Sequence, residues 1–508
     1  MASNPIGAPL SASGAQRKKS LMQQDLHKAV SHLLTLGGDE RIVPAHEDGT
    51  NKYFSSPFPR QTVTYASSTA NDISQAAFSH LCQFVADHEM TPDMPGTDYA
   101  GHLSVLRSRI ASAYGLPQGT EIAFSASGTD LEYIALHAFA GRAPNGIHNV
   151  LLGADEVGSG CILSAAGQYF AAQTALGMPT AKGQPVPGLS PVSLSEVSVR
   201  NGFGEAFDSA VIVAAMRSEI ERALLAGKFP LLHVVHGSKT GLILPHLDDI
   251  DALITQYGDS IGFVVDACQA RITSPAIGAY LMRGAVVLLT GSKFMGGPPF
   301  SGFALVPRHT ALRIAPLGEG MATIFRRAEL PESWVGDVSL PDSGNAGLTL
   351  RLAAALFELE RFQALDFHTI ARVVEQFRSA SLALVNRIAG TRVTPYPFAD
   401  RDSAGAHPIE MRTLTTVDLS GEGRAIDFDG ATAIQLKMMQ SGVRLGQPVK
   451  CARFQGLDMA GKVRGTLRIG ISMPQMVALA ELGEAAEAQL DRDMAAIGDA
   501  FEAAIAAT

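Results

Sequence analysis

The 508-residue sequence is 46% hydrophobic and 18% charged, a mixture typical of globular proteins that excludes a disordered chain. Its net charge of -9 argues against a general nucleic-acid binder, because phosphate backbones are bound by clustered positive charge. The four cysteines are widely spaced, which argues against a disulfide framework and favours a reducing compartment. Since the chain also shows no apolar signal core and no membrane-spanning stretch, we expect a cytoplasmic protein without nucleic-acid or membrane partners.

The chain is expected to divide into four parts. A loose tail with one short helix at 22–36 is followed by an irregular arm that ends in an amphipathic helix at 72–90. A large domain comes next, and a long helix at 346–366 then links it to a smaller C-terminal α/β domain. The expected boundaries of these parts are 1–38, 39–94, 95–345 and 346–508.

Short apolar runs alternate with helical segments through the large domain. The strand-like runs are 121–126, 149–154, 230–237, 261–267, 285–290 and 303–307. Continuous apolar strands alternating with helices predict a mostly parallel sheet covered on both faces, and the short gap before the last run favours an antiparallel final pair. The predicted fold class is therefore α/β, with a large, mostly parallel mixed sheet.

Two residues at the ends of neighbouring strands carry the strongest chemical signal. Asp266 ends the run IGFVVDA, and Lys293 follows the run AVVLLT, one helix and one strand later. A single aspartate at a strand end is most often a helix cap, and a single lysine in a glycine-rich loop usually faces solvent. Together, however, they are expected at the carboxyl edge of the sheet, where α/β folds bind ligands. There a lysine can form an imine with a carbonyl cofactor, and an aspartate can keep a heteroaromatic nitrogen protonated.

A third segment adds a phosphate-binding pattern. In SASGTD (125–130), Ser127 and Gly128 allow close backbone approach, and Thr129 precedes a helix whose N-terminal amides can donate to an anion. The hydroxyls of Thr290 and Ser292 flank the candidate lysine and could bind the same phosphate. The pattern alone is weak, because many helices begin with similar caps.

These segments resemble the pyridoxal-phosphate enzymes of fold type I, in particular the class V aminotransferase and cysteine desulfurase branch. IAFSASGTDLEYIAL (122–136) is similar to the phosphate loop of that branch, DACQ (266–269) to its Asp-x-x-Gln, and TGSK (290–293) to its Ser-x-His-Lys. The resemblance implies that Lys293 binds pyridoxal 5'-phosphate covalently, that Asp266 faces the pyridine nitrogen and that Gln269 faces the phenolic oxygen. GTLRIGIS (465–472) resembles the strand whose arginine binds the substrate carboxylate, which implies this role for Arg468.

The sequence departs from the family at three positions. Val157 stands where an aromatic residue or histidine usually stacks on the cofactor ring, and Ser292 stands where histidine is common. Asn345 replaces the threonine of a Ser-Gly-Thr segment that reaches the phosphate of the neighbouring subunit. Because sites in this family are completed across the subunit interface, the resemblance also implies a homodimer.

Several alternatives stay open at this stage. Lys239 also follows a strand and could replace Lys293 as the covalent lysine, although no flexible segment follows it. Cys451 lies near the position of the sulfur-accepting cysteine of desulfurases, without the usual surroundings. His233 and His236 are three apart on a predicted strand, so they should face opposite sides and cannot share a metal. Further candidate carboxylate binders are Arg444, Arg453 and Arg464.

The functional prediction is an enzyme that uses pyridoxal 5'-phosphate to act at the α-carbon of an amino-acid substrate. Aminotransferase comes first, because transamination needs no added nucleophile. A C–S lyase or a cysteine desulfurase-like enzyme is the alternative. A non-catalytic regulator that binds the cofactor is the alternative from another class, since the departures at Val157, Ser292 and Asn345 would suit it.

Overall fold

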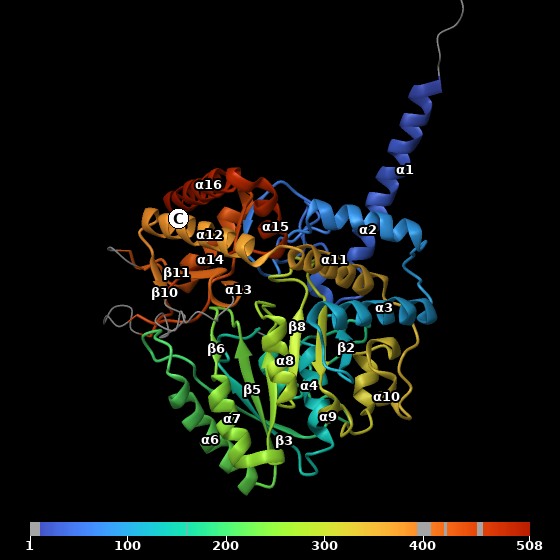
Figure 1. Ribbon diagram of the computed structural model, residues 1–508, viewed down its shortest axis with the longest axis vertical. Coiled ribbons are helices and arrows are strands. Elements are labelled where there is room, and N and C mark those ends of the chain that lie inside the picture. The colour runs from blue at the N-terminus through green and yellow to red at the C-terminus, as the bar shows by residue number, and fades with distance from the viewer. Residues whose placement is uncertain (1–10, 159, 394–407, 421–423, 455–460, 508) are drawn as a thin grey trace, which may run out of the picture.

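The centre of the molecule is an eight-stranded sheet (Figure 1). The structure is a computed structural model that describes residues 11–158, 160–393, 408–420, 424–454 and 461–507. Its strand order is β2-β9-β8-β7-β5-β3-β4, and β6 pairs with β5 at one side. The strands are β2 (Glu121–Ser125), β3 (Ile147–Leu152), β4 (Val192–Val197), β5 (Phe229–His236), β6 (Ile243–Leu244), β7 (Gly262–Asp266), β8 (Val286–Thr290) and β9 (Gly302–Val306).

Strand direction in this sheet follows the prediction. The pairs β3–β4, β3–β5, β5–β7 and β7–β8 are parallel, while β9 runs antiparallel to both β8 and β2. The strand β4, which the sequence analysis did not identify, carries the half-buried residues VSLSEV rather than a continuous apolar run. Its mixed pattern at the edge of the sheet explains why it was missed.

Helices cover both faces of the sheet. Along β7, Phe263 and Val265 belong to one hydrophobic core and Val264 to the other, as expected when successive side chains alternate between faces. The helices of the large domain include α3 (Gly96–Tyr114), α4 (Leu131–Ala140), α6 (Ser209–Leu225), α7 (Leu247–Tyr257) and α8 (Ser274–Met282). The sheet is therefore buried on both sides, which suits its continuous apolar strands.

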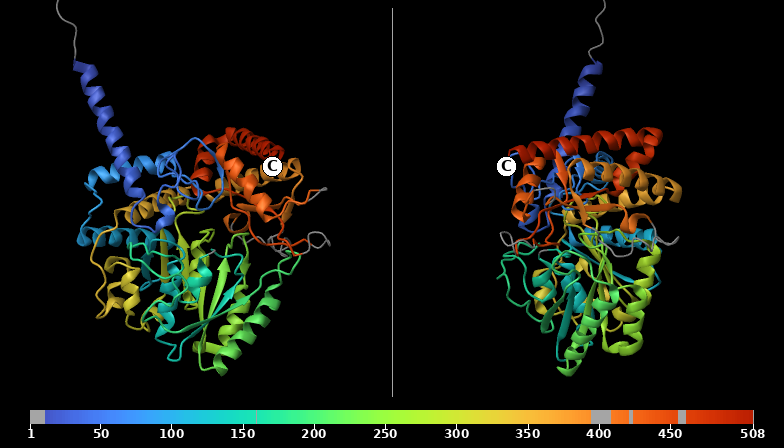
Figure 2. Two further views of the ribbon diagram at one scale, coloured as in Figure 1. Left: turned by 180° about the vertical axis from the view of Figure 1, so that it is seen from behind. Right: turned by 90° about the vertical axis from the view of Figure 1, so that its left-hand side faces the viewer.

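The C-terminal part lies beyond the long helices α11 (Ala346–Gln363) and α12 (Phe367–Arg387). It contains an antiparallel three-stranded sheet, which is covered by the last helices of the chain (Figure 2). The elements are β10 (Thr391–Val393), β11 (Leu414–Asp418), β13 (Thr466–Gly470), α14 (Phe428–Gln440), α15 (Met473–Leu482) and α16 (Ala486–Ala506). Arg468 lies in the middle of β13, so its side chain starts from a rigid strand.

The N-terminal segment begins with α1 (Ser11–Leu34), which projects from the body in Figure 1. This helix starts earlier than the expected 22–36, and the first ten residues of the expected tail lie outside the described residues. The following arm is irregular, as predicted, apart from β1 (Val63–Tyr65), which pairs in parallel with β12 (Val443–Leu445). Then α2 (Gln75–Asp87) confirms the helix predicted at 72–90.

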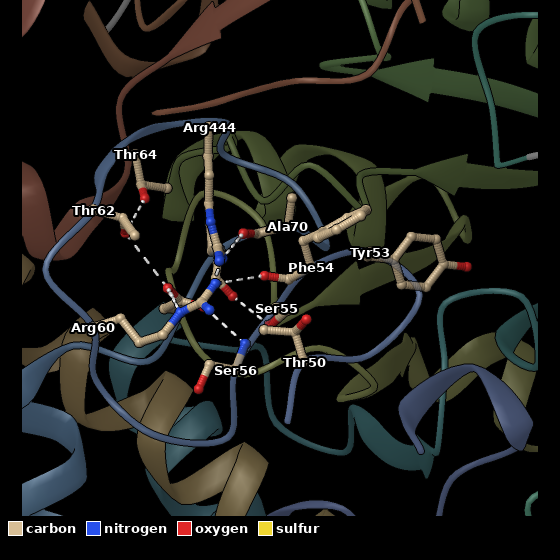
Figure 3. A network of polar contacts seen from close by, with 12 residues as sticks. Thr50, Tyr53, Phe54, Ser55, Ser56, Arg60, Thr62, Thr64, Ala70 and Arg444 are labelled. Carbon is tan, nitrogen blue, oxygen red and sulfur yellow. Dashed lines mark hydrogen bonds and ion pairs between the residues drawn. The ribbon is translucent and has the colours of Figure 1, made fainter. Parts of the chain in front are cut away.

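Arg444 ties the arm to the C-terminal part. Its guanidinium forms a 2.7 Å ion pair with Asp72 and donates to the carbonyl oxygen of Ala70 at 3.1 Å, while Arg60 pairs with the same aspartate at 3.3 Å. Figure 3 shows the two arginines converging on the arm backbone near Ser56. Because Arg444 is buried and paired, it is a structural residue and the prediction that it binds a carboxylate ligand is not supported.

No described helix is both long and apolar enough to cross a membrane.

Candidate active site

Asp266 and Lys293 emerge at the same edge of the large sheet. In the parallel pair β7–β8, Asp266 lies opposite Leu288, and Lys293 follows the end of β8 by three residues. Both charges act on two buried thiols. Burial raises the pKa of Cys161 and of Cys268, the Asp266 carboxylate raises it further, and the Lys293 ammonium lowers it. The two candidate residues are therefore neighbours, as the spacing predicted.

The segment after β8 turns sharply around Lys293. The carbonyl oxygen of Lys293 accepts hydrogen bonds from the backbone N–H of Gly296 and from Asn71 Nδ2, each at 3.1 Å. Gly296 has φ +78°, a conformation that favours glycine, and a Cβ on Gly291 would lie 2.4 Å from Ala355 of α11. The glycines thus let the backbone pass close to its neighbours, and within the described chain the Lys293 amine makes no hydrogen bond or ion pair.

The predicted phosphate loop packs against the end of β8. A Cβ on Gly128 would lie 2.8 Å from Thr290 Cγ2 and 3.3 Å from Cys268 Sγ, so only glycine permits this approach. Thr290 Oγ1 donates to the carbonyl oxygen of Cys268 at 2.7 Å, which fixes β8 against the turn after β7. The structure therefore brings the loop, Asp266 and Lys293 to one place.

The hydroxyls at this edge differ in their partners. Ser127 Oγ donates to Asp130 at 2.6 Å and is already engaged in the loop. Thr129 and Ser292 are buried, yet their side chains have no hydrogen-bond partner among the described residues. Because both hydroxyls are unpaired and can donate to a ligand, these two are the better candidates for anion contacts.

Gln269 is oriented by a buried arginine that the sequence analysis missed. Arg271 Nη1 donates to Gln269 Oε1 at 2.9 Å, and its other contacts are the hydroxyls of Thr413 and Ser67 at 2.9 and 2.7 Å. Because a guanidinium can only donate, the amide oxygen of Gln269 must face Arg271. The NH2 group of Gln269 then points away from Arg271 and can donate to another acceptor. Burial, with the charge of Arg468 as a second cause, lowers the pKa of Arg271 to about 9.

Among the four candidate arginines, only Arg468 is both buried and without an acidic partner in the described residues. Its Nε donates to the carbonyl oxygen of Gln447 at 2.8 Å and its Nη1 to that of Lys239 at 3.3 Å. By contrast, Arg464 pairs with Asp418 at 3.0 Å, and Arg453 is exposed. Arg468 therefore stays the leading candidate for a carboxylate.

Lys239 lies beside the same cluster. It lies on the loop after β5, and burial, with the charges of Arg468 and Lys293 as smaller causes, lowers its pKa to about 8. Its Nζ reaches only the carbonyl oxygen of Asp155, at 3.4 Å. Geometry alone thus leaves Lys239 as an alternative covalent lysine.

The remaining candidates have structural environments. Val157 is buried in the main hydrophobic core, and Asn345 caps α11 while it donates to the carbonyl oxygen of Gly37 at 3.0 Å. Cys451 is buried, and burial raises its pKa to about 12. His233 and His236 contact opposite layers, Glu132 of α4 and Tyr280 of α8, which confirms that they face opposite sides of the sheet. Among the described residues, no group of His, Cys, Asp and Glu is arranged to hold a metal ion.

The arm supplies a further residue that the sequence analysis did not identify. Arg41 Nη2 donates to Ser127 Oγ at 3.3 Å, and its guanidinium lies 5.0 and 5.1 Å from the rings of Phe170 and Phe300. Its acidic partner is Asp39, at 2.5 Å. No local pattern predicts this contact, because it joins the arm to a loop distant in sequence.

A second unpredicted feature lies beneath the edge. His233 Nε2 and Glu132 Oε1 are 2.9 Å apart, and both side chains are buried. Burial lowers the pKa of His233, but the carboxylates of Glu132 and Asp266 raise it more, so the net direction is upward. The pair therefore lies near Asp266.

Sequence comparisons and structure comparisons give different results for this chain. No family model matches it, and no curated protein matches it in sequence. Its structure is similar to a cysteine desulfurase from Escherichia coli, with a TM-score of 0.52 and 14% identity over 87% of this chain and 94% of that one. It is also similar to a pyridoxamine-pyruvate aminotransferase from Mesorhizobium loti, with a TM-score of 0.49 and 18% identity over 88% of this chain and 98% of that one. The first likeness, together with the sheet described above, confirms the predicted architecture: the chain has the α/β fold of the fold-type-I transferases.

Proposed function

We propose that this protein binds pyridoxal 5'-phosphate and acts at the α-carbon of an amino acid, with transamination as its reaction. The observation that carries the proposal is the meeting of Lys293 and Asp266 at the carboxyl edge of the sheet. A ligand of this class needs an amine for its aldehyde, an acid for its ring nitrogen and donors for its phosphate. The edge offers all three.

The side chains present fit such a group. The hydroxyls of Thr129 and Ser292 and the amine of Lys293 have no partner elsewhere in the described structure, and Gly128 leaves room where a side chain would collide with Thr290. Asp266 Oδ1 accepts from the backbone N–H of Cys268 at 2.9 Å, which orients the carboxylate. When bound, the cofactor supplies an electron sink for the charge that develops at the substrate α-carbon.

The chain's own residues divide the remaining work. Arg468 holds the substrate carboxylate with the N–H groups of its free Nη2. The NH2 group of Gln269, whose amide oxygen is taken by Arg271, would help to hold the cofactor by donating a hydrogen bond. The amine of Lys293 removes and returns the proton at the α-carbon as general base and acid.

Absorbance spectroscopy of the purified protein tests this proposal. Twenty amino acids and cysteine derivatives are added one at a time, and the spectrum of the bound cofactor and the products are recorded. Transamination predicts a spectral change together with a keto acid. A protein that shows no cofactor absorbance after incubation with pyridoxal 5'-phosphate would contradict the proposal.

The same experiment separates the alternatives. Sulfide, or pyruvate with a thiol, would indicate a desulfurase or C–S lyase. The burial that raises the pKa of Cys451 to about 12 keeps this thiol protonated at neutral pH, which favours transamination over desulfuration. A bound cofactor that no amino acid perturbs would instead indicate a regulator. We also propose a homodimer, which light scattering of the purified protein tests.

A further inference from the structure

We infer that the substrate is an amino acid with a second acidic group, and that Lys239 binds this group beside the carboxylate held by Arg468. This inference rests on the proposed function and names the substrate class of the same site. It arises from the charges around Lys239, which the resemblance to known enzymes did not explain.

Lys239 and Arg468 are held next to each other by the backbone. Arg468 Nη1 donates to the carbonyl oxygen of Lys239 at 3.3 Å, and the backbone N–H of Lys239 donates to the carbonyl oxygen of Glu156 at 3.0 Å. The two cationic side chains thus start from fixed points, one on the loop after β5 and the other on β13. They can present two positive charges to one small ligand.

The cations lack acidic partners. Among the described residues, neither side chain forms an ion pair, and Arg468 is only 4% exposed. Its Nη2 has no acceptor in the described structure, although Nε and Nη1 each have a carbonyl oxygen. A buried guanidinium with free donors and no counter-charge is an anion site awaiting its ligand.

The Glu156 carboxylate near this cluster already has partners of its own. Glu156 is buried, and its carboxylate is already engaged by Arg200 at 3.0 Å, by Ser238 at 2.7 Å and by Thr240 at 2.8 and 2.9 Å. Lys293 adds a further positive charge near Lys239, and this repulsion supports the lowered pKa of Lys239 described above. A monoacid bound to Arg468 would leave the ammonium group of Lys239 without a partner.

Space is available next to Lys239. A cavity of about 320 Å³ is lined by the loops after β3 and β4 and by residues 450–453, and it includes Asp155 and Glu156. Lys239 Nζ contacts the carbonyl oxygen of Asp155 at its wall.

Calorimetric binding of succinate and butyrate to the purified protein tests the inference without any reaction. Both ligands have four carbons and no amine, but only succinate has two carboxylates. We expect succinate to bind at least about tenfold more tightly than butyrate, because it meets both cations. Lys239→Gln should weaken succinate about tenfold and leave butyrate within about twofold, and Lys239→Arg should retain most of the succinate affinity.

Lys462→Gln is the matched control, because it removes one positive charge from an exposed side chain that pairs only weakly with Asp427, at 3.8 Å. It should leave both affinities unchanged. Equal binding of the two ligands by the unaltered protein would overturn the inference, and so would unchanged succinate binding in Lys239→Gln. Either result leaves the proposed function standing if amino acids still perturb the bound cofactor. Absence of that perturbation, with succinate still preferred, would reject the proposed function and keep the anion site.

Discussion

Two clusters of charged side chains lie in this molecule, and they differ in their pairing. In the arm network, formed by Arg444, Arg60 and Asp72, both arginines pair with the aspartate. Arg444 also donates a hydrogen bond to a nearby backbone carbonyl oxygen. In the candidate site, Lys239 and Arg468 lie side by side with no acidic partner in the described chain. Both clusters contain buried arginine, so burial alone does not distinguish them.

The difference teaches which charges are structural. A buried ion pair that is complete within the chain fixes one segment against another, as the arm is fixed against β12. A buried cation that has neither a counter-charge nor, as Arg271 has, neutral oxygens for its N–H groups costs folding free energy and is retained where a ligand completes it. Removing a residue from the first cluster should therefore affect stability, whereas removing one from the second should affect binding.

The largest expected effect is on catalysis and comes from Lys293→Ala. This change removes the amine that has no other role in the described structure, so activity should fall by about 10³-fold or more while the protein stays folded. Steady-state assays with the best amino acid from the screen, together with circular dichroism, measure both properties. Retained activity would transfer the covalent role to Lys239.

Asp130→Asn tests how the predicted phosphate loop makes the free energy of unfolding depend on pH. Burial raises the pKa of Asp130 from 3.8 to about 7, despite the hydrogen bond from Ser127. Because the folded protein keeps a proton that the unfolded chain releases, its free energy of unfolding should fall as the pH rises from about 4 to 7, by up to about 4 kcal/mol. Asparagine has no such titration, so urea unfolding of the variant should lose this part of the pH dependence. If the free energy of unfolding depended on pH in the same way in both proteins, Asp130 would not be protonated in the folded state.

Arg444→Met breaks the arm network. It leaves the buried Asp72 with Arg60 as its remaining cationic partner, so the free energy of unfolding should fall by about 3 kcal/mol. Arg453→Met is the control, because among the described residues this exposed side chain donates only to the carbonyl oxygen of Gly461, so the free energy of unfolding should change by less than about 0.5 kcal/mol. Urea unfolding compares the two variants, and equal losses would remove the distinction between the clusters.

Arg468→Met is the counterpart in the candidate site. No ion pair is broken, so stability should change by less than about 1 kcal/mol, whereas affinity for the amino-acid substrate should fall by roughly 100-fold. Titration of the bound cofactor's absorbance with substrate gives the affinity. A stability loss as large as that of Arg444→Met, with affinity unchanged, would assign Arg468 to the fold instead.

The sequence could predict the edge of the large sheet because its signals are local. Continuous apolar strands place Asp266 and Lys293, and the glycine at 128 marks the close approach to Thr290. The likeness of the structure to a cysteine desulfurase confirms the fold, while the roles of the individual site residues stay predictions.

The partners of the buried arginines could not be predicted in the same way. Arg444 meets Asp72 and Arg271 meets Ser67 across distances of hundreds of residues in the chain, so no periodicity or motif records them. Arg41 likewise meets Ser127 from 86 residues away, and no motif records this contact. Which arginine is free for a ligand is therefore a property of the tertiary structure.

The central claim is that one amine and one acid at this edge hold the cofactor, and borohydride reduction tests it most directly. The protein is incubated with pyridoxal 5'-phosphate, reduced, digested and mapped by mass spectrometry. The account predicts a single modified peptide that carries the label on Lys293, and loss of that label in Lys293→Ala. Label on Lys239, or random labelling of surface lysines, would contradict it.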